Sequence, residues 1–456
     1  MGSDVRLDWP GRAWRVGENI ARDATWSVWE RTPPSPQRAR DGGAHGRFLF
    51  GDVLDAAARL AAEGTRADLV YIDPPYASQA DYVREARLDG PADGRTRRAH
   101  AFKDTWRKDE GGLGAYLDEL APRVEALARL LVDTGTLWIH LDWRAAYLVR
   151  VILDEIMGRD AFKNEIVWRR APNLGRQAAS GQFGRTLDTI LVYGGPRAVL
   201  RPPTRLEPID AKAIRWDDEG RPFTSAPRGD YTDESIARLE QEGRVHRAAS
   251  GKAYVKYFLV KDDEGRWCRE RRVDALWTDV APLRHAKTTE RTGYPTQKPR
   301  ALLERIVRCG APEGGLVVDL YAGSGTTGEA ALACGRRFVL GDSGAPALAT
   351  SRARLLAAGA GLTIEVPHGG APKMSEARAR READGVHLDA PKEPLGWAIG
   401  DRREDVFCTR WHGERRWGRA TEPAPRTAPA PPEGPLFVRA WEDDGTVAEA
   451  SLDASS

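Results

Sequence analysis

The segment VVDLYAGSGTTGEAA, from Val317 to Ala331, joins an apolar run of strand length to a glycine-rich turn and the start of a helix. Its glycines follow the spacing G-x-G-x-x-G, and residues without a side chain let a ligand approach the backbone closely. An acidic residue, Asp342, lies about 20 positions after the first glycine, as in dinucleotide-binding turns. A nicotinamide-dependent oxidoreductase is therefore one interpretation. A phosphate-binding NTPase loop is disfavoured, because no lysine precedes Thr326.

Four apolar runs of strand length, the one before the glycine turn among them, carry an acidic residue at their carboxyl ends. These acids are Asp52, Asp73, Asp319 and Asp342, and a fifth run, Thr136 to Asp142, fits the same sheet. Such runs are typical of buried parallel strands, and open α/β sheets bind ligands at the carboxyl ends of their strands. Because helical patterns alternate with the runs, the sequence predicts a doubly wound, mostly parallel sheet.

The alternation of strands and helices is confined to two blocks, 46–170 and 291–366, which predict one α/β domain in two pieces. Between them, 171–290 is polar and rich in Gly, Pro and Arg with scattered aromatic residues, which is typical of an inserted recognition region. An N-terminal extension covers 1–45. A C-terminal extension, 367–456, contains strand-like pieces and a Pro/Ala-rich linker, and we expect a small α+β structure there without assigning it a function.

Charge is unevenly distributed along the chain. Residues 161–300 hold 27 Lys and Arg against 19 Asp and Glu, a net charge of +8, whereas the whole chain carries +2. A polyanion would bind the middle of the chain. No apolar run approaches the roughly 18 residues of a membrane span, and the N-terminus lacks a secretory signal, so we expect a cytoplasmic protein without a membrane partner. The four cysteines lie far apart, and we expect neither a metal site nor disulfides.

The most specific signal is Asp73-Pro74-Pro75-Tyr76, directly after an apolar strand. Proline has no N–H, so the two prolines take the chain out of the sheet and leave carbonyl groups free. A carboxylate beside a free carbonyl accepts both N–H groups of an exocyclic amine, and a tyrosine ring stacks on a planar base. The alternative interpretation is a strand that ends in a tight turn.

The order of the motifs resembles the amino-DNA methyltransferases of the permuted class β, which includes the modification subunits of type III restriction systems. The resemblance covers roughly residues 45–360 and rests on DPPY, a variable region, TQKPRALLERIV from Thr296, and then the glycine turn. GDVLD, AFKDTW, TLWIHLD, FKNEIVWRR, TLDTILVYGG and LWTDV occur at the expected places. A dehydrogenase gives no reason for this combination.

The resemblance implies a Rossmann-like methyltransferase fold with circularly permuted motif order and S-adenosylmethionine as cofactor. It implies that Asp73 and the Pro74 carbonyl hold the amine of a flipped base on which Tyr76 stacks, with Pro75 completing the motif. The cofactor would contact Asp52, Asp319, Tyr321, Gly323, Gly325, Thr326 and Asp342, and Thr296, Gln297 and Lys298 would close its pocket. The sequence departs from the family at Tyr321, where phenylalanine is usual, and at Asp342, where glutamate is common.

Asp at the first motif position favours N6 of adenine as the methylated atom, with N4 of cytosine as the alternative. The large insert favours duplex DNA over RNA. We expect the middle region to recognise the target DNA sequence. The candidate DNA contacts there are Arg170, Arg176, Arg185 and Lys252. Tyr254 and Tyr257 are candidates to fill the gap that the flipped base leaves in the duplex. We expect packing or hydrogen-bonding roles for His140 and His285. By analogy we expect a homodimer, or a subunit of a restriction or defence complex docked through the C-terminal extension.

Overall fold

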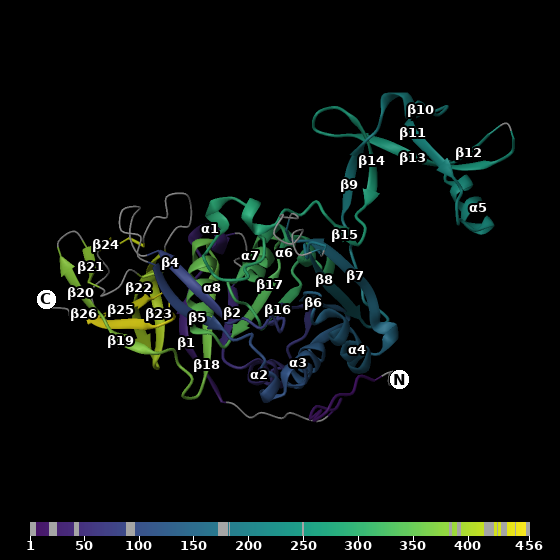
Figure 1. Cartoon of the computed structure of the whole chain (residues 1–456). Helices are drawn as coiled ribbons and strands as arrows, with labels where there is room; N and C mark the ends of the chain where they lie inside the picture. The colour runs from purple at the N-terminus through teal and green to yellow at the C-terminus, as the bar shows by residue number, and fades with distance from the viewer. Residues whose placement is uncertain are drawn as a thin grey trace. The chain divides into compact units, whose positions relative to one another are not determined.

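The computed structural model (Figure 1) describes residues 6–17, 25–40, 45–87, 96–171, 181, 183–248, 250–382, 385–389, 394–414, 424–425, 427–429, 436–442 and 444–452. The chain divides into two compact units. The larger unit comprises Met1–Arg201 and Ala275–Ser456, and the smaller unit is Pro202–Asp274. Among the described residues, none of the helices has the length and apolar character that crossing a membrane requires.

Six parallel strands at the centre of the larger unit come from both sequence blocks. In spatial order they are β6 (Leu131–Leu141), β3 (Ala67–Ile72), β16 (Leu316–Asp319), β17 (Arg337–Asp342), β2 (His45–Phe50) and β18 (Gly361–Pro367). Strand β2 of the first block lies between β17 and β18 of the second, so the two blocks form one sheet. The prediction of a doubly wound, mostly parallel sheet is confirmed.

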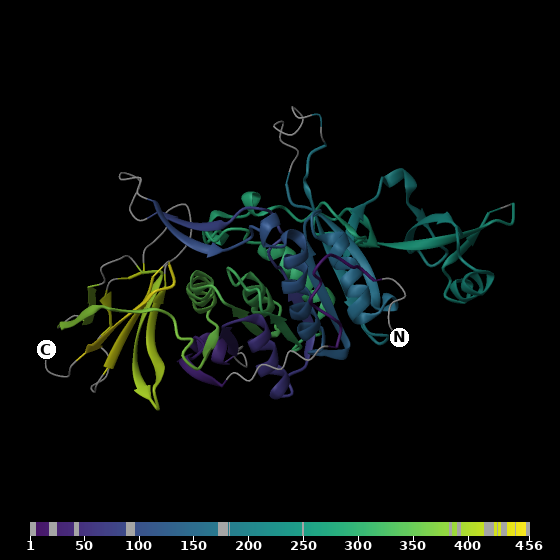
Figure 2. The same cartoon turned by 60° about the horizontal axis from the view of Figure 1, so that its bottom comes forward.

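Helices cover both faces of these strands, because successive strand residues point to opposite sides and both sets are apolar. Val70 and Ile72 of β3 share a core with one layer of helices. Leu69 points the other way, toward Gly310 at the end of a helix in the second layer. The first layer is α2 (Val53–Ala62), α3 (Gly112–Ala128) and α4 (Ala146–Met157), and the second is α6 (Arg300–Gly310), α7 (Thr326–Ala333) and α8 (Ala345–Ala357) (Figures 1 and 2).

The strand order reverses between β3 and β16. From β3 the chain proceeds to β6 on one side, and from β16 it proceeds to β17 on the other. Connections that leave two adjacent strands in opposite directions open a crevice at the carboxyl ends of those strands. The loop at Asp73, after β3, and the loop at Gly323, after β16, therefore lie on either side of that crevice.

Beyond β6 the sheet continues with strands of mixed direction. Strand β8 (Leu187–Gly194) runs antiparallel to both β6 and β7 (Phe162–Arg169), and β15 (Leu276–Trp277) pairs with β7. All of these belong to the larger unit. Near the glycine-loop side of the crevice, β4 (Tyr82–Arg87) and β5 (Thr96–Phe102) form a separate hairpin.

At its other edge the same sheet runs into the C-terminal extension. Strand β1 (Trp26–Thr32) pairs antiparallel with β18 and parallel with β23. The sheet then continues through β23 (Val406–Glu414), β22 (Gly396–Arg403), β25 (Leu436–Trp441), β26 (Val447–Leu452) and β19 (Met374–Glu376), drawn in yellow-green to yellow in Figure 2. A small sheet is formed by β20 (Arg378–Glu382), β21 (Gly385–Asp389) and β24 (Thr427–Ala428).

The expected α+β structure of this extension was wrong for the part that the structure describes, which contains strands and no helix. Alternation explains the difference: Trp397 and Ile399 point into a core between the small sheet and β22, whereas Ala398 packs against Ala349 and Ala353 of α8. A period of two residues with apolar side chains on both faces is the pattern of a strand covered on both sides.

The smaller unit is an antiparallel sheet with one helix. Ile236 and Leu239 of the helix pack on Val255 of the sheet. Its elements are β9 (Thr204–Pro208), β10 (Arg215–Trp216), β11 (Pro222–Pro227), α5 (Asp233–Gln241), β12 (Val245–Arg247), β13 (Ala253–Lys261) and β14 (Trp267–Arg272). This unit lies inside the predicted recognition region, 171–290, and is narrower, because β8 and β15 belong to the sheet of the larger unit.

Candidate active site

A pocket of about 540 Å³ lies at the carboxyl ends of β3, β16 and β17. The loop after β3 and the glycine loop after β16 both line it, although 250 positions separate Asp73 from Gly323 in the chain. All but one of the predicted catalytic and cofactor-binding residues line this pocket. They are Asp52, Asp73, Pro74, Pro75, Tyr76, Thr296, Gln297, Lys298, Asp319, Tyr321, Gly323, Thr326 and Asp342.

The exception is Gly325, which is not among the residues that line the pocket. Its φ is 74°, in the left-handed region, and it caps the N-terminus of α7. A Cβ atom at this position would lie 2.8 Å from the Oγ of Ser351 in α8. The turn and the close packing of α7 on α8 therefore require a glycine at position 325, and its contact with the cofactor stays a prediction.

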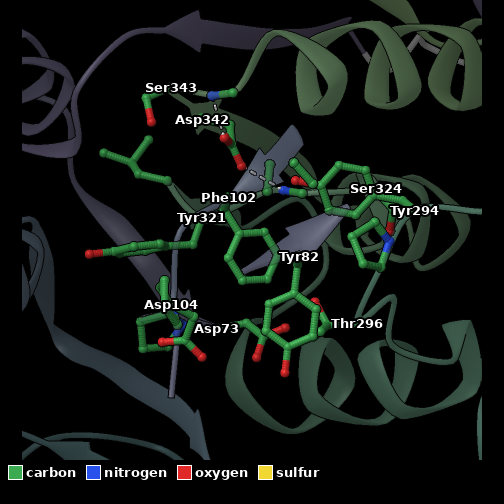
Figure 3. A pocket seen from close by; sticks show the side chains of 18 of the residues that line it. Asp73, Tyr82, Phe102, Asp104, Tyr294, Thr296, Tyr321, Ser324, Asp342 and Ser343 are labelled. Carbon is green, nitrogen blue, oxygen red and sulfur yellow. Dashed lines mark hydrogen bonds between the residues drawn. The ribbon is translucent and has the colours of Figure 1, made fainter. Parts of the chain in front are cut away.

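Two buried carboxyl groups, Asp319 and Asp342, lie on the glycine-loop side of the pocket. One oxygen of Asp342 accepts from the Gly323 N–H at 2.9 Å and the other from the Gly344 N–H at 2.7 Å (Figure 3), while Asp319 accepts from the Tyr321 N–H at 2.9 Å. Burial raises the pKa of Asp319 to about 7 and that of Asp342 to about 6. A cation in the pocket would favour ionisation of both groups.

Across the pocket, the carboxylate of Asp73 already has two donors. The Tyr76 hydroxyl donates to it at 2.5 Å, and the Lys298 ammonium lies 2.7 Å from Oδ1 and 2.5 Å from Oδ2. The Pro75 carbonyl accepts from the Tyr116 hydroxyl at 2.9 Å, and no described residue donates to the Pro74 carbonyl. The prediction that Lys298 closes the cofactor pocket is thus refined, because its ammonium binds the acid that is expected to hold the target amine.

Asp104, from the AFKDTW segment, holds the backbone of the loop that follows Asp73. Its buried carboxylate accepts from the N–H groups of Tyr76 at 3.2 Å, Ala77 at 2.8 Å and Ser78 at 2.9 Å. Two residues of this loop that are not glycine, Ala77 and Gln79, have φ values of 55° and 62°. Sequence reasoning used AFKDTW only as part of the resemblance and missed this role of Asp104.

Aromatic side chains that sequence reasoning also missed line the pocket. Tyr82 and Phe102 stack on each other with ring centres 4.7 Å apart, and Tyr294 lies near Gly323 (Figure 3). Tyr82 and Phe102 pair across the β4–β5 hairpin, which had not been predicted. Their approach to the pocket depends on how that hairpin packs, so no local sequence pattern reveals it.

Asp52, predicted to contact the adenine of the cofactor, has partners for both oxygens. One accepts from the Leu54 N–H at 2.8 Å and caps α2, and the other forms an ion pair with Arg123 at 2.7 Å. The carboxylate lines the pocket with its charge balanced by Arg123. A contact between Asp52 and adenine stays a prediction.

The predicted DNA contacts do not form one group. Arg170 pairs with the buried Asp188 at 2.7 Å, and the Arg185 guanidinium lies 4.2 Å from the centre of the Trp143 indole, both in the larger unit. Lys252 belongs to the smaller unit, and Arg176 lies outside the described residues. Their role in DNA binding stays a prediction.

The tyrosines and histidines singled out in the sequence have different surroundings. Tyr257 is half-buried against the core of the smaller unit, with the Arg269 guanidinium 3.4 Å from its ring centre, and Tyr254, three positions earlier on β13, is also half-buried. His140 is buried and hydrogen-bonds to the Tyr71 hydroxyl and Asp188, as expected, whereas His285 is exposed. A role of Tyr254 or Tyr257 in filling a gap in DNA stays a prediction.

A family model of N6/N4 DNA methylases matches residues 67–349, more than half of the chain and the whole of the pocket apart from the segment at Asp52. The chain belongs to the N6/N4 DNA methylase family. The interpretation as an oxidoreductase is thereby excluded.

This DNA methylase is similar to several methyltransferases and modification subunits. It is 25% identical over 366 residues to the type II methyltransferase M.EcaI of Enterobacter cloacae, with 74% of this chain and 75% of that enzyme covered. It is 50% identical over 300 residues to the DNA adenine methyltransferase YhdJ of Escherichia coli K12, with coverage of 66% and 79%. It is 26% identical over 344 residues to the Mod subunit of the type III restriction-modification enzyme StyLTI of Salmonella typhimurium. That match covers 65% of this chain and 51% of the subunit.

The pocket of this DNA methylase fits S-adenosylmethionine, the cofactor of the family. Its volume is in the range of small-molecule sites, and its acidic and aromatic lining suits a ligand with a cationic sulfonium and amine. A Cβ at Gly323 would lie 3.1 Å from the Tyr294 ring, so a bare glycine keeps this side of the pocket open. Asp319, Tyr321, Gly323 and Asp342 are the residues that would hold the cofactor.

Proposed function

We propose that this DNA methylase methylates N6 of an adenine that is flipped out of duplex DNA. The observation that carries the proposal is that Asp73 of the Asp-Pro-Pro-Tyr motif and Gly323 of the glycine turn line one pocket. Adenine is supported by aspartate at the first motif position and by 50% identity to a relative named as a DNA adenine methyltransferase. The target sequence is set by groups outside this pocket.

The residues around Asp73 have the chemistry that methylation of an amine requires. S-adenosylmethionine would supply a methyl group from its sulfonium and leave as the neutral thioether, and the methylated nitrogen, briefly cationic, would then pass one proton to solvent. Asp73 and the Pro74 carbonyl accept the two N–H groups of the amine, and the carboxylate stabilises the positive charge that develops on nitrogen. Tyr76 stacks on the base. This stacking contributes about 1–3 kcal/mol, which offsets much of the free energy that flipping the base costs.

In this scheme Lys298 has to release Asp73 when the target amine arrives. The ammonium offers the carboxylate the same kind of N–H donors as the amine, and both of its short contacts are to Asp73. Lys298 therefore keeps the partly buried carboxylate paired until the base displaces it, which avoids the cost of leaving that charge unpaired.

The test is to express the chain alone in a host without DNA methylation and to sequence the host DNA by a method that detects modified bases. N6-methyladenine within a defined sequence is the expected result. Asp73→Ala should bind S-adenosylmethionine within about twofold of the normal Kd and reduce turnover by orders of magnitude, because in this scheme Asp73 contacts the base and not the cofactor. N4-methylcytosine would overturn the choice of base, and undiminished turnover by Asp73→Ala would overturn the site.

We also propose that the enzyme acts in restriction or defence, since the Mod subunit of a type III restriction enzyme is among its relatives. Whether it works alone, as a homodimer or as a subunit stays a prediction. Light scattering of the purified protein and of its complex with a duplex measures its oligomeric state. Methylation of host DNA by the chain expressed alone would contradict dependence on a partner.

A further inference from the structure

Three aromatic side chains of the larger unit are exposed to solvent. Among the described residues of that unit, Trp143 is 45% exposed, Tyr147 69% and Phe183 100%, and the remaining aromatic residues are more buried. Solvent-exposed rings that gather in one place are typical of interaction sites. Such rings contribute little to the folded core, and their contact with water is unfavourable until a partner covers them. We call Trp143, Tyr147 and Phe183, together with Arg170 and Arg185, the aromatic edge.

The residues of the aromatic edge meet at the same sheet edge as Asp73. Strand β6 is parallel to β3, with Ile139 opposite Ile72, so Trp143 follows β6 where Asp73 follows β3. Strand β8 is antiparallel to β6, so the segment that precedes it, with Phe183 and Arg185, returns to this edge. The Arg185 guanidinium, 4.2 Å from the centre of the Trp143 indole, joins the two segments.

The aromatic edge lies on the side of β3 opposite the cofactor loops. The strand order is β7, β8, β6, β3, β16, β17, and the glycine loop and Asp342 follow β16 and β17. A base held by Asp73 therefore has the cofactor residues on one side and the aromatic edge on the other. DNA that delivers the base has to approach from a side that the cofactor does not fill.

The net positive charge of residues 161–300 belongs to the larger unit, and Arg170 and Arg185 of the aromatic edge are part of it. The smaller unit, 202–274, holds 15 Lys and Arg and 15 Asp and Glu, whereas its flanks, 161–201 and 275–300, hold 12 against 4. The whole +8 of residues 161–300 thus belongs to the larger unit.

The acidic groups at the aromatic edge are buried and paired, and the arginines are not buried. Asp142 is paired with Arg144, and Asp188 with Arg170. Arg170 and Arg185 are exposed. A surface of exposed rings among exposed arginines favours a nucleic acid, whose phosphates bind the guanidinium groups and whose bases stack on the rings.

We propose that the aromatic edge binds duplex DNA next to the flipped base, with a ring stacking on the partner base that is left unpaired when the target leaves the helix. The inference rests on the proposed function and extends it, because it assigns DNA contacts to the larger unit outside the pocket. The arginines bind the flanking phosphates, and Trp143, held by Arg185, is the ring best fixed for stacking.

The experiment measures methyl transfer from labelled S-adenosylmethionine to a duplex that carries the sequence found by sequencing host DNA. Trp143→Ala, Tyr147→Ala and Phe183→Ala are compared with Met374→Ala, an exposed apolar residue of the C-terminal extension. If the ring of Trp143 stacks on one base, its removal should raise the KM for DNA roughly tenfold. The Kd for S-adenosylmethionine should stay unchanged. The Met374 variant should match the parent protein.

A second duplex, which lacks the base opposite the target adenine, separates stacking from a general loss of affinity. With no unpaired base to stack on, the difference between the parent protein and Trp143→Ala should shrink. An unchanged KM in all three aromatic variants would overturn the inference, as would a change of oligomeric state with unchanged KM, which would assign the edge to a second copy of the chain. A parent protein that binds the cofactor and methylates no DNA would instead overturn the proposed function.

Discussion

At the scale of single residues, the loop after Asp73 is held in a backbone conformation that its own sequence does not favour. Ala77 and Gln79 have positive φ values, and a left-handed residue other than glycine costs roughly 1–2 kcal/mol. Asp104 offsets this cost with three hydrogen bonds to backbone N–H groups, a charge-assisted kind that is stronger than one between neutral groups. We therefore regard Asp104 as a positioning residue for Asp73 and Tyr76.

Asp104→Ala should lower kcat roughly a hundredfold. Loss of its hydrogen bonds would let the loop that carries Tyr76 move, and a displacement of about 1 Å of catalytic groups lowers a rate by about that factor. Asp104→Asn keeps one acceptor oxygen and should lose less. The Kd for S-adenosylmethionine, measured by calorimetry, should stay within about threefold of the parent value in both variants, since Asp104 binds the loop after β3 and not the glycine loop. Equal losses of cofactor binding and of turnover would contradict a positioning role.

The buried carboxyl groups near the glycine loop predict that cofactor binding depends on pH. Because burial raises the pKa of Asp319 to about 7, the folded protein without ligand binds a proton that the unfolded chain releases near pH 4. The stability that this proton contributes is complete below about pH 4 and is lost as the pH rises through 7. A cationic ligand favours the ionised form, so its binding releases the proton.

The affinity for S-adenosylmethionine should therefore rise between pH 5.5 and about 7 and then level off. Calorimetry in two buffers of different ionisation enthalpy should detect release of a proton at pH 6.5. Asp319→Asn should bind more weakly and with a flatter pH profile. A parent profile that is flat over this range would show that Asp319 does not face the positive charge of the cofactor.

At the scale of elements, strand β1 connects the catalytic sheet to the C-terminal extension. Arg352 of α8 is fully buried between Glu30 of β1 and Glu414 of β23, with both contacts at 2.9 Å, and Trp441 of β25 covers its guanidinium at 3.3 Å. Removal of one partner of a buried ion pair costs about 3–5 kcal/mol. The extension is thus part of the folded core of the larger unit, and docking of a partner through it stays a prediction.

Truncation after residue 366 should yield a protein that is insoluble or melts at least 10 °C lower, because it exposes one side of β1 and leaves Arg352 without Glu414. Trp441→Ala tests the same contact in the full chain and should lower the free energy of unfolding by about 3–5 kcal/mol in a denaturant titration. Met374→Ala, an exposed change in the same extension, is the control. A stable truncated enzyme would contradict this account.

At the scale of the whole molecule, the smaller unit is an insertion whose two ends meet. Thr204 of β9 pairs with Arg272 of β14, and the Val273 N–H donates to the Pro203 carbonyl at 2.8 Å. Such an insertion can be replaced without separating the strands that flank it. Its core of Ile236, Leu239 and Val255 is independent of the pocket.

Replacement of residues 204–272 by a short Gly-Ser linker should leave the Kd for S-adenosylmethionine and the melting temperature nearly unchanged. If the predicted recognition region includes this unit, the variant should lose methylation at the defined sequence while it still binds DNA through the larger unit. Sequencing of host DNA and a binding assay measure the two effects. Methylation of the same sequence by the variant would assign sequence reading to the larger unit.

The sequence alone determined the strands that end in acids, the glycine turn, the DPPY loop and their permuted order, because a buried strand and a tight turn leave their signatures within a few neighbouring residues. It did not place Lys298 on Asp73, Asp104 under the loop, or Tyr82 beside Phe102. These contacts join positions far apart in the chain and arise only when β3 lies beside β16 and the β4–β5 hairpin packs near the pocket. The net positive charge of residues 161–300 could likewise be assigned to the larger unit only from the fold, because the sequence alone does not show which segments belong to the same unit.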